Sequence, residues 1–215
     1  MITWIRYYRA QPGPDDELAR VLREAVEPVL GTLSTDGKVA GWGVAAPLSQ
    51  NDDWWTHLAW VDFADWGAVD AFADTLLGAQ LPAAVARDVF LRHTVEPEAP
   101  SAVRPRYVAM HMHWIKRGHD DDALALFHEW AKPVFVELAE AGKVGAWAQM
   151  MEDTAVTGDW RCLVRYPITG LSVLDDVMTS LMQFEMPRLK GFEIRLREMS
   201  ERNYRGQILR VLHSA

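Results

Sequence analysis

The sequence predicts an α+β fold in which two copies of one β-α-β-β-α-β unit pack sheet against sheet. Two observations lead to this prediction. The chain matches itself at an offset of about 105 residues, and each copy alternates strand-like and helix-like segments in the same order. The composition is that of a globular chain, because 49% of the 215 residues are apolar and 24% are charged. A mass of 24.3 kDa allows one large domain or two small ones.

The internal repeat keeps one register without gaps. Chance similarity between amphipathic segments would not keep glycine, proline, lysine and tryptophan in order, so we interpret the pattern as a tandem duplication. A proline-rich stretch separates the copies, which gives a first repeat at 1–95, a linker at 96–105, a second repeat at 106–199 and a C-terminal extension at 200–215. Matching pairs include Glu24 with Glu129, Pro28 with Pro133, Gly37-Lys38-Val39 with Gly142-Lys143-Val144, Trp42 with Trp147, Trp55 with Trp160, and Leu91-Arg92 with Leu196-Arg197.

Each copy opens with a strand and a helix. Segments 2–9 and 107–116 are rich in aromatic and branched residues and predict strands. Acidic pairs follow at 15–16 and 120–121, where a helix dipole favours negative charge, and apolar residues then recur with the 3.6-residue period of a helix. Pro28 and Pro133 fall inside these patterns, so each helix should kink or restart there.

The second part of each copy contains two further strands and a helix between them. Gly37 and Gly142 should end the first helices. The remaining segments predict second strands at 39–45 and 144–150, third strands at 55–63 and 160–166, second helices at 66–77 and 171–182, and fourth strands at 89–94 and 194–199. The tail from Ser200 falls outside the repeat, and a short helix or an extra strand covering one barrel end both fit it.

A four-stranded sheet with both helices on one face must bury its other face, and two copies can do this by packing their open faces together. With the strand Val61-Asp62-Phe63, the helix at 66–72 and the repeat in place, the chain resembles a tandem member of the dimeric α/β-barrel superfamily, which is ferredoxin-like. The resemblance covers about residues 2 to 199 and implies an intramolecular dimeric α/β barrel. It also implies a range of activities, including cofactor-free monooxygenases, polyketide cyclases, lactone isomerases and haem enzymes of the chlorite dismutase and dye-decolorising peroxidase type.

Charge and composition disfavour several classes of binding partner. A net charge of −8 and a pI near 5.3 disfavour nucleic acid, which is bound by clustered Lys and Arg. Cys162 is the single cysteine and forms no internal disulfide. No apolar run reaches membrane-spanning length and the N-terminus lacks a signal-peptide pattern, so we expect a cytoplasmic protein that binds no membrane. No nucleotide-binding loop or nucleophile-elbow motif is present. We expect a monomer or a homodimer of pseudo-dimers.

Strand alternation selects the residues that should line the barrel interior. On 107–116, Val108, Met110 and Met112 form the more apolar set and should pack on the helices, so His111 and His113 should point inward. The small residues Gly41 and Gly43 should likewise face the helices. Cys162 should lie on the helix side as an inert small hydrophobe. The other inward candidates are the substrate-binding residues Trp4, Arg6, Tyr8, Trp42, Trp60, Trp147 and Gln149, together with Arg165.

Three readings of the histidine pair remain open. In the first, the protein is an enzyme acting on a hydrophobic or aromatic, oxygenated small molecule: His111 or His113 moves a proton, Arg165 holds an oxyanion, and tryptophans enclose the ring. The resemblance then implies cofactor-free monooxygenase or cyclase chemistry. In the second, haem or a metal binds His111 or His113, although no further ligand stands at metal-binding spacing. In the third, the barrel is a non-catalytic small-ligand-binding protein and the histidines are hydrogen-bonded structural residues.

Overall fold

The computed structural model describes residues 1–10, 15–48, 55–78, 83–95, 105–152, 162–176 and 195–215. These form two compact units. The first unit comprises Met1–Arg92 and Leu209–Ala215, and the second comprises His93–Ile208. None of the helices in the described ranges is long and apolar enough to cross a membrane.

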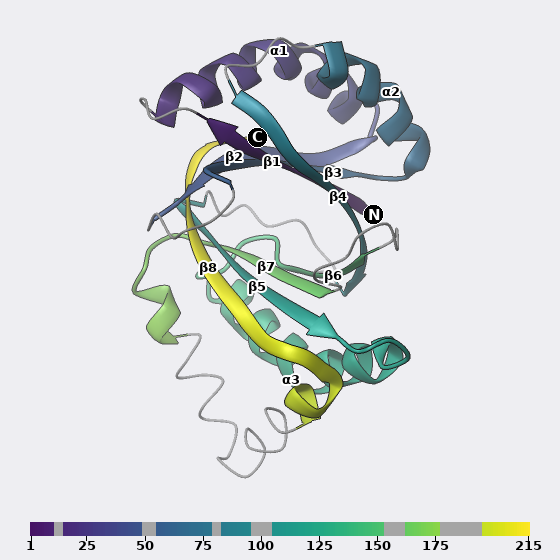
Figure 1. Cartoon of the computed structure of the whole chain (residues 1–215). Coiled ribbons are helices and arrows are strands. Elements are labelled where there is room, and N and C mark those ends of the chain that lie inside the picture. Colours follow the sequence, from purple (N-terminus) through teal and green to yellow (C-terminus); the bar gives the residue numbers. More distant parts are fainter. Residues whose placement is uncertain (11–14, 49–54, 79–82, 96–104, 153–161, 177–194) are drawn as a thin grey trace. The chain divides into compact units, whose positions relative to one another are not determined.

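The first unit is an antiparallel sheet with two helices on one face. β1 pairs with β3 and β4, and β2 pairs with β3 and with the last residues of β8. Figure 1 shows α1 and α2 together on the same side of these strands. The elements are β1 (Ile2–Ala10), α1 (Asp15–Thr35), β2 (Val39–Pro47), β3 (His57–Phe63), α2 (Trp66–Gly78), β4 (Ala83–Val95) and β8 (Ser200–Ser214).

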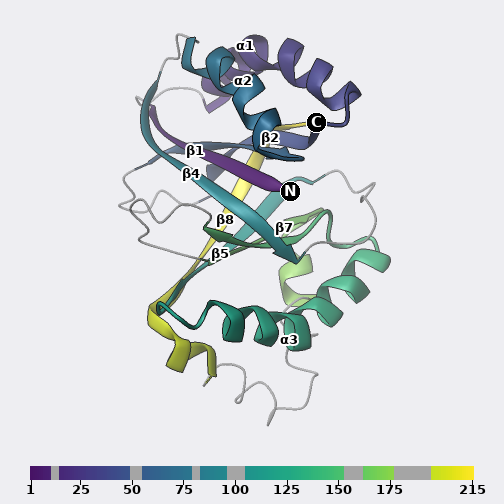
Figure 2. The same ribbon diagram turned by 90° about the vertical axis from the view of Figure 1, so that its right-hand side faces the viewer.

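The second unit is also an antiparallel sheet with a helix on one face. β7 pairs antiparallel with β5 and with β6, and α3 packs on one face of these strands (Figure 2). We call the face covered by helices the helix face of each unit and the opposite one its far face. The elements are β5 (Tyr107–Ile115), α3 (Asp120–Glu140), β6 (Ala148–Glu152) and β7 (Cys162–Ile168).

The strand pairing closes on itself. Hydrogen-bonded neighbours follow the order β1-β3-β2-β8-β5-β7-β6-β4, with β4 returning to β1, which is the strand order of a closed barrel. β4 and β8 are the long strands that contribute residues to both units. The predicted α+β class and the closed barrel are therefore confirmed.

The helix ends agree with the sequence, and of the two effects expected of the prolines, a kink or a restart, the restart is absent. Gly37 and Gly142 have φ values of +71° and +68° and end α1 and α3, because a residue without a Cβ takes this left-handed conformation at little cost. The Lys38 amide donates to the Leu33 carbonyl at 2.8 Å and closes the end of α1. No restart occurs, since α1 continues through Pro28 and α3 through Pro133.

The last strand of the second unit lies elsewhere than predicted. The repeat register places it at 194–199, but residues 195–199 are helical and β8 begins at Ser200. Leu196 therefore lies in a helix while its expected counterpart Leu91 lies in β4, so the gapless register fails after the third strand. The tail is an extra strand, one of the two expected forms, and it serves as the closing strand itself. The predicted helix at 171–182 lies partly outside the described residues.

Candidate functional site

His111 faces α3 rather than the far face of its sheet. Its Nε2 atom lies 2.8 Å from the Tyr166 hydroxyl, and the two rings stack with centroids 5.5 Å apart. Tyr166 in turn contacts Phe135 of α3, with ring centroids 5.0 Å apart. His111 and Tyr166 thus form a hydrogen-bonded pair on the helix face of the second unit.

His113 follows on the same face. Its ring meets Phe127 of α3 edge-on at 5.5 Å, and its strand position pairs with Cys162, which belongs to the core cluster beneath α3. The expectation that both imidazoles point away from the helices is therefore wrong. The Met110 and Met112 positions occupy the far face instead, because they alternate with the helix-facing ones along β5.

Burial keeps both histidines neutral. Desolvation lowers the pKa of His111 to about 4. Desolvation, together with the nearby His111, lowers the pKa of His113 to about 3. A neutral imidazole retains one nitrogen lone pair, so each ring is in the form that accepts a proton at pH 7.

Two buried polar groups on this face have no hydrogen-bond partner among the described residues. They are Nε1 of Trp147, whose ring stacks on Phe135 at 5.4 Å, and Oε1 of Gln149. The Gln149 amide nitrogen reaches Sγ of Cys162 at 3.6 Å. Strand pairing aligns Gln149 and His111 with Val164 between them, so these groups share one row across the sheet. Because buried polar groups are rarely left unpaired, the row is a candidate ligand site.

Arg165 does not join this site. It pairs with Met110 and alternates with Val164 and Tyr166, both of which lie in the helix-face core, so its side chain belongs to the far face. The structure therefore separates Arg165 from His111 by the thickness of the sheet. Cys162 lies on the helix side as predicted, and burial raises the pKa of its thiol to about 12.

The first unit groups most of its sequence candidates on its own helix face. Trp4, Tyr8 and Trp42 belong to the core cluster shared with α1 and α2, so the expectation that they turn away from the helices is wrong for these residues as well. The same expectation is wrong for Trp147 and Gln149, which lie on the helix face of the second unit. Gly43 was expected to face the helices, but it alternates with Trp42 and lies on the far face, where the Trp60 ring covers it.

Arg6 is fixed by a carboxylate that the sequence did not single out. Asp88 accepts from Arg6 Nε at 2.6 Å and Nη2 at 2.8 Å, and from Trp4 Nε1 at 2.8 Å. Burial lowers the pKa of Arg6, but the hydrogen bonds and charge of Asp88 outweigh this and leave it above its ordinary value. The Arg6 guanidinium lies 4.8 Å from the centre of the Trp4 ring. Asp88 lies opposite Arg6 in the β1–β4 register, a relation that no single-strand pattern reveals.

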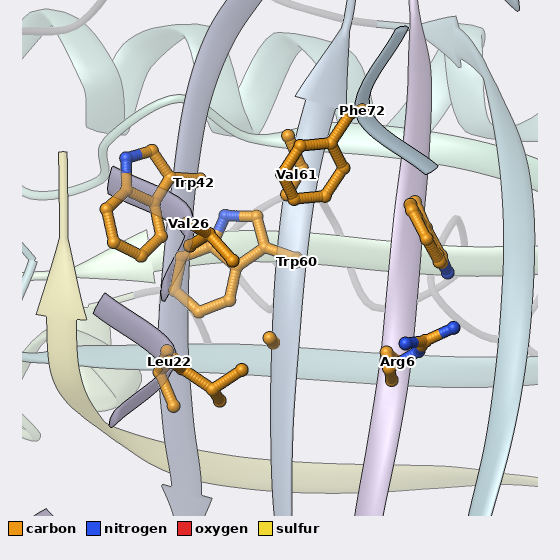
Figure 3. A pocket seen from close by; sticks show the side chains of 10 residues that line it. Arg6, Leu22, Val26, Trp42, Trp60, Val61 and Phe72 are labelled. Carbon is orange, nitrogen blue, oxygen red and sulfur yellow. The ribbon is translucent and has the colours of Figure 1, made fainter. Parts of the chain in front are cut away.

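A small cavity lies on the helix face of the first unit. Figure 3 shows Leu22, Val26 and Trp42 on one side of it, Val61 and Phe72 on another, and Arg6 at its edge. Trp60 also borders the cavity, although its ring covers Gly43 on the far face. The cavity volume is about 20 Å³. Four of the predicted substrate-binding residues, Trp4, Arg6, Trp42 and Trp60, therefore line one cavity, while Tyr8 does not.

The described residues offer few ligands for a metal ion. Within the ranges that the structure describes, no three His, Cys, Asp or Glu side chains lie close enough together to hold a metal ion. His111 Nε2, the nitrogen that most often binds iron or zinc, is engaged by Tyr166.

Comparisons with known proteins identify the fold. No family profile and no curated protein matches the sequence. Among solved structures, a "putative monooxygenase" from Lactobacillus acidophilus has a TM-score of 0.65 and 11% identity, with 100% of this chain and 95% of that one covered. An anthrone oxidase-like protein has a TM-score of 0.59 and 10% identity, covering 100% and 92%. A haem-binding protein from Thermus thermophilus has a TM-score of 0.58 and 10% identity, covering 98% and 90%.

These likenesses span almost the whole of each chain, but at such low identity they carry the fold and not the activity. The predicted resemblance is confirmed at that level: the chain has the fold of the dimeric α/β-barrel proteins.

Proposed function

We propose that this protein is an enzyme that deprotonates a small planar aromatic molecule on the helix face of the second unit. The deprotonated molecule then reacts with dioxygen. The observation that carries the proposal is the row of buried polar groups beneath α3. It combines a neutral His111 bonded to Tyr166 with two groups that have no hydrogen-bond partner in the described part of the chain, Trp147 Nε1 and Gln149 Oε1.

The unpaired groups specify what the ligand must offer. Trp147 Nε1 can only donate, so it needs an oxygen acceptor, whereas Gln149 Oε1 accepts and needs a hydroxyl donor. The Phe135 and Trp147 rings supply a flat apolar wall next to these atoms. A fused aromatic ring system that carries both a hydroxyl and a carbonyl oxygen satisfies all three requirements.

The proton passes from the substrate to the Tyr166–His111 pair. The 2.8 Å hydrogen bond lets His111 take up the Tyr166 proton as Tyr166 accepts one from the substrate. Desolvation opposes a lone imidazolium, but the same low-dielectric setting strengthens its attraction to the oxyanion formed beside it. The Trp147 N–H stabilises that oxyanion. Charge separation is thus favoured only with the substrate in place.

The oxidation that follows needs no metal when the deprotonated ring is electron-rich enough to reduce dioxygen. A ring methylene then becomes a carbonyl: one oxygen atom of dioxygen forms the C=O bond to the methylene carbon as its two C–H bonds break, and the other oxygen leaves as water with those two hydrogens. The solved neighbours described as a monooxygenase and as anthrone oxidase-like support this class. No cofactor takes part in this scheme, and Arg165, on the far face, has no role in it.

The haem alternative fits these residues less well. A haem iron would need the Nε2 atom that Tyr166 occupies, or His113, which is packed edge-on against Phe127 beneath α3. Haemin titration tests it directly: a sharp Soret band at one equivalent that is lost in His111→Ala or His113→Ala would replace our proposal with haem binding.

The enzyme proposal is tested by oxygen uptake with a hydroxyanthrone, a tricyclic ring carrying both required oxygens. We expect turnover by the wild-type chain, a loss of at least about tenfold in kcat for Tyr166→Phe, and a loss of at least about a hundredfold for His111→Gln. Met112→Leu on the far face is the matched control, because it replaces a buried side chain of similar volume in the same strand. Equal rates in all four proteins would refute the assignment, and oxygen-independent conversion would identify a cyclase instead.

We also infer that the two units arose by duplication. Corresponding elements begin at Ile2 and Tyr107, at Asp15 and Asp120, and at His57 and Cys162, which keeps the offset of about 105 residues. The polar row has not been kept: Val44 and Val61 stand where the second unit has Gln149 and Tyr166. Chemistry in the second unit alone is the expected consequence.

A further inference from the structure

The helix face of the first unit contains the cavity and has Val44 and Val61 where the second unit has Gln149 and Tyr166. Apart from Ala59, every residue that lines it is buried. The wall is formed by aliphatic and aromatic carbon atoms from α1, α2, β2 and β3. These come mainly from Leu22, Val26, Val44, Ala59, Val61 and Phe72.

The surface that lines this cavity is apolar. Arg6 and Trp4 both donate to Asp88, and Figure 3 shows the nitrogen atoms of Arg6 turned away from Leu22 and Trp42. A buried water needs two to four hydrogen-bonding partners, and an apolar lining offers it none. A cavity of this kind stays dry and favours an apolar occupant.

Size then restricts the occupant. An apolar cavity of about 150 Å³ accommodates benzene, and about 10–15 Å³ is the least space that holds one water. At about 20 Å³, this cavity is too small for an aromatic ring but sufficient for a molecule of two heavy atoms.

We propose that the cavity beneath α1 and α2 of the first unit binds a small nonpolar molecule of the size of dioxygen. The argument rests on the shape and chemistry of the first unit and does not depend on the reaction proposed for the second. If that reaction does consume dioxygen, the cavity is a store of the co-substrate within the same chain.

Xenon is the probe, because it is apolar, monatomic and visible by anomalous scattering. Crystals of the full chain under xenon pressure should show an atom between Val26 and Ala59. In Ala59→Val the site should lose its occupancy, because the added methyl groups fill the space, and the second unit already carries valine at this position, Val164. Val26→Ala should raise the occupancy by enlarging the site. Ala10→Val, the same change in β1 away from the cavity, should leave it unaltered.

The alternative outcomes are distinct. Ordered water in the cavity under xenon, xenon bound only elsewhere, or equal occupancy in Ala59→Val and wild type would each overturn the proposal. For a variant that does not crystallise, the change in the ¹²⁹Xe chemical shift on adding protein in solution gives the same comparison. Loss of oxygenase activity with intact xenon binding would refute the proposed function alone.

Discussion

Replacing the partly buried His111 and the buried His113 should remove much of the acid sensitivity of the fold. In unfolded chains the histidine pKa is about 6.5, whereas burial lowers it to about 4 in His111 and about 3 in His113. The unfolded state therefore binds more protons below pH 6.5, so the free energy of unfolding falls as the pH falls through this range. The stabilisation is complete above the unfolded pKa and is lost progressively toward the folded pKa values.

The magnitude follows from the two shifts. At pH 5.0, each unfolded histidine is almost fully protonated while the folded one is almost fully neutral, which costs about 2 kcal/mol for each side chain relative to pH 7.5. Together the pair contributes about 4 kcal/mol to the loss of stability between these pH values. This is a large part of the 5–15 kcal/mol that holds a typical domain folded.

Urea unfolding at pH 7.5 and 5.0, followed by tryptophan fluorescence, measures the effect. The double variant His111→Gln/His113→Gln should lose about 4 kcal/mol less than the wild type between the two pH values, because carboxylates contribute equally to both proteins. The NMR ring signals of His111 and His113 should have titration midpoints at about pH 4 and about pH 3 in the folded wild type. A difference under 1 kcal/mol between the proteins, or a His111 or His113 ring that titrates near pH 6.5, would refute the reasoning.

Three further predictions concern individual contacts. Asp88→Asn should destabilise the chain by about 2–3 kcal/mol, because it leaves the buried Arg6 guanidinium without its counter-charge; a urea midpoint equal to wild type would contradict this. Gly43→Ala should cost about 1–3 kcal/mol, since the new Cβ would lie 2.3 Å from the Trp60 ring and 2.7 Å from the His213 carbonyl; thermal unfolding measures it, and Gly31→Ala, with open space around it, is the matched control. Cys162 should resist a thiol reagent in the native state and react on unfolding, because burial raises its pKa to about 12; rapid labelling of folded protein would show that the site is open.

The sequence predicts the order and boundaries of most elements because these depend on local signals. Apolar periodicity places α1 and α3, and Gly37 and Gly142 mark where they end. The error after the third strand has a different origin. A gapless register carries no information about an insertion, so the repeat does not identify Ser200–Ser214 as the closing strand.

Which face a strand turns to the helices was not predictable from that strand alone. Both residue sets of β5 contain apolar side chains. Alternation shows that the two sets lie on opposite faces, but it does not show which set faces the helices. Pairing with a neighbouring strand decides which set faces the helices: His113 lies opposite Cys162, whose helix-side position the sequence does predict. Strand register depends on contacts between distant segments, and so does the pairing of Arg6 with Asp88.

Because β4 and β8 each begin in one unit and end in the other, neither half of the chain is a complete fragment. A polypeptide ending near residue 95 would lack the 209–214 segment that pairs with β2, leaving the backbone of Gly43 to Pro47 as an open edge. Chain cleavage within 96–104 should therefore yield two pieces that reassociate by exchanging their terminal arms. Separately expressed pieces should stay insoluble or aggregate until they are mixed.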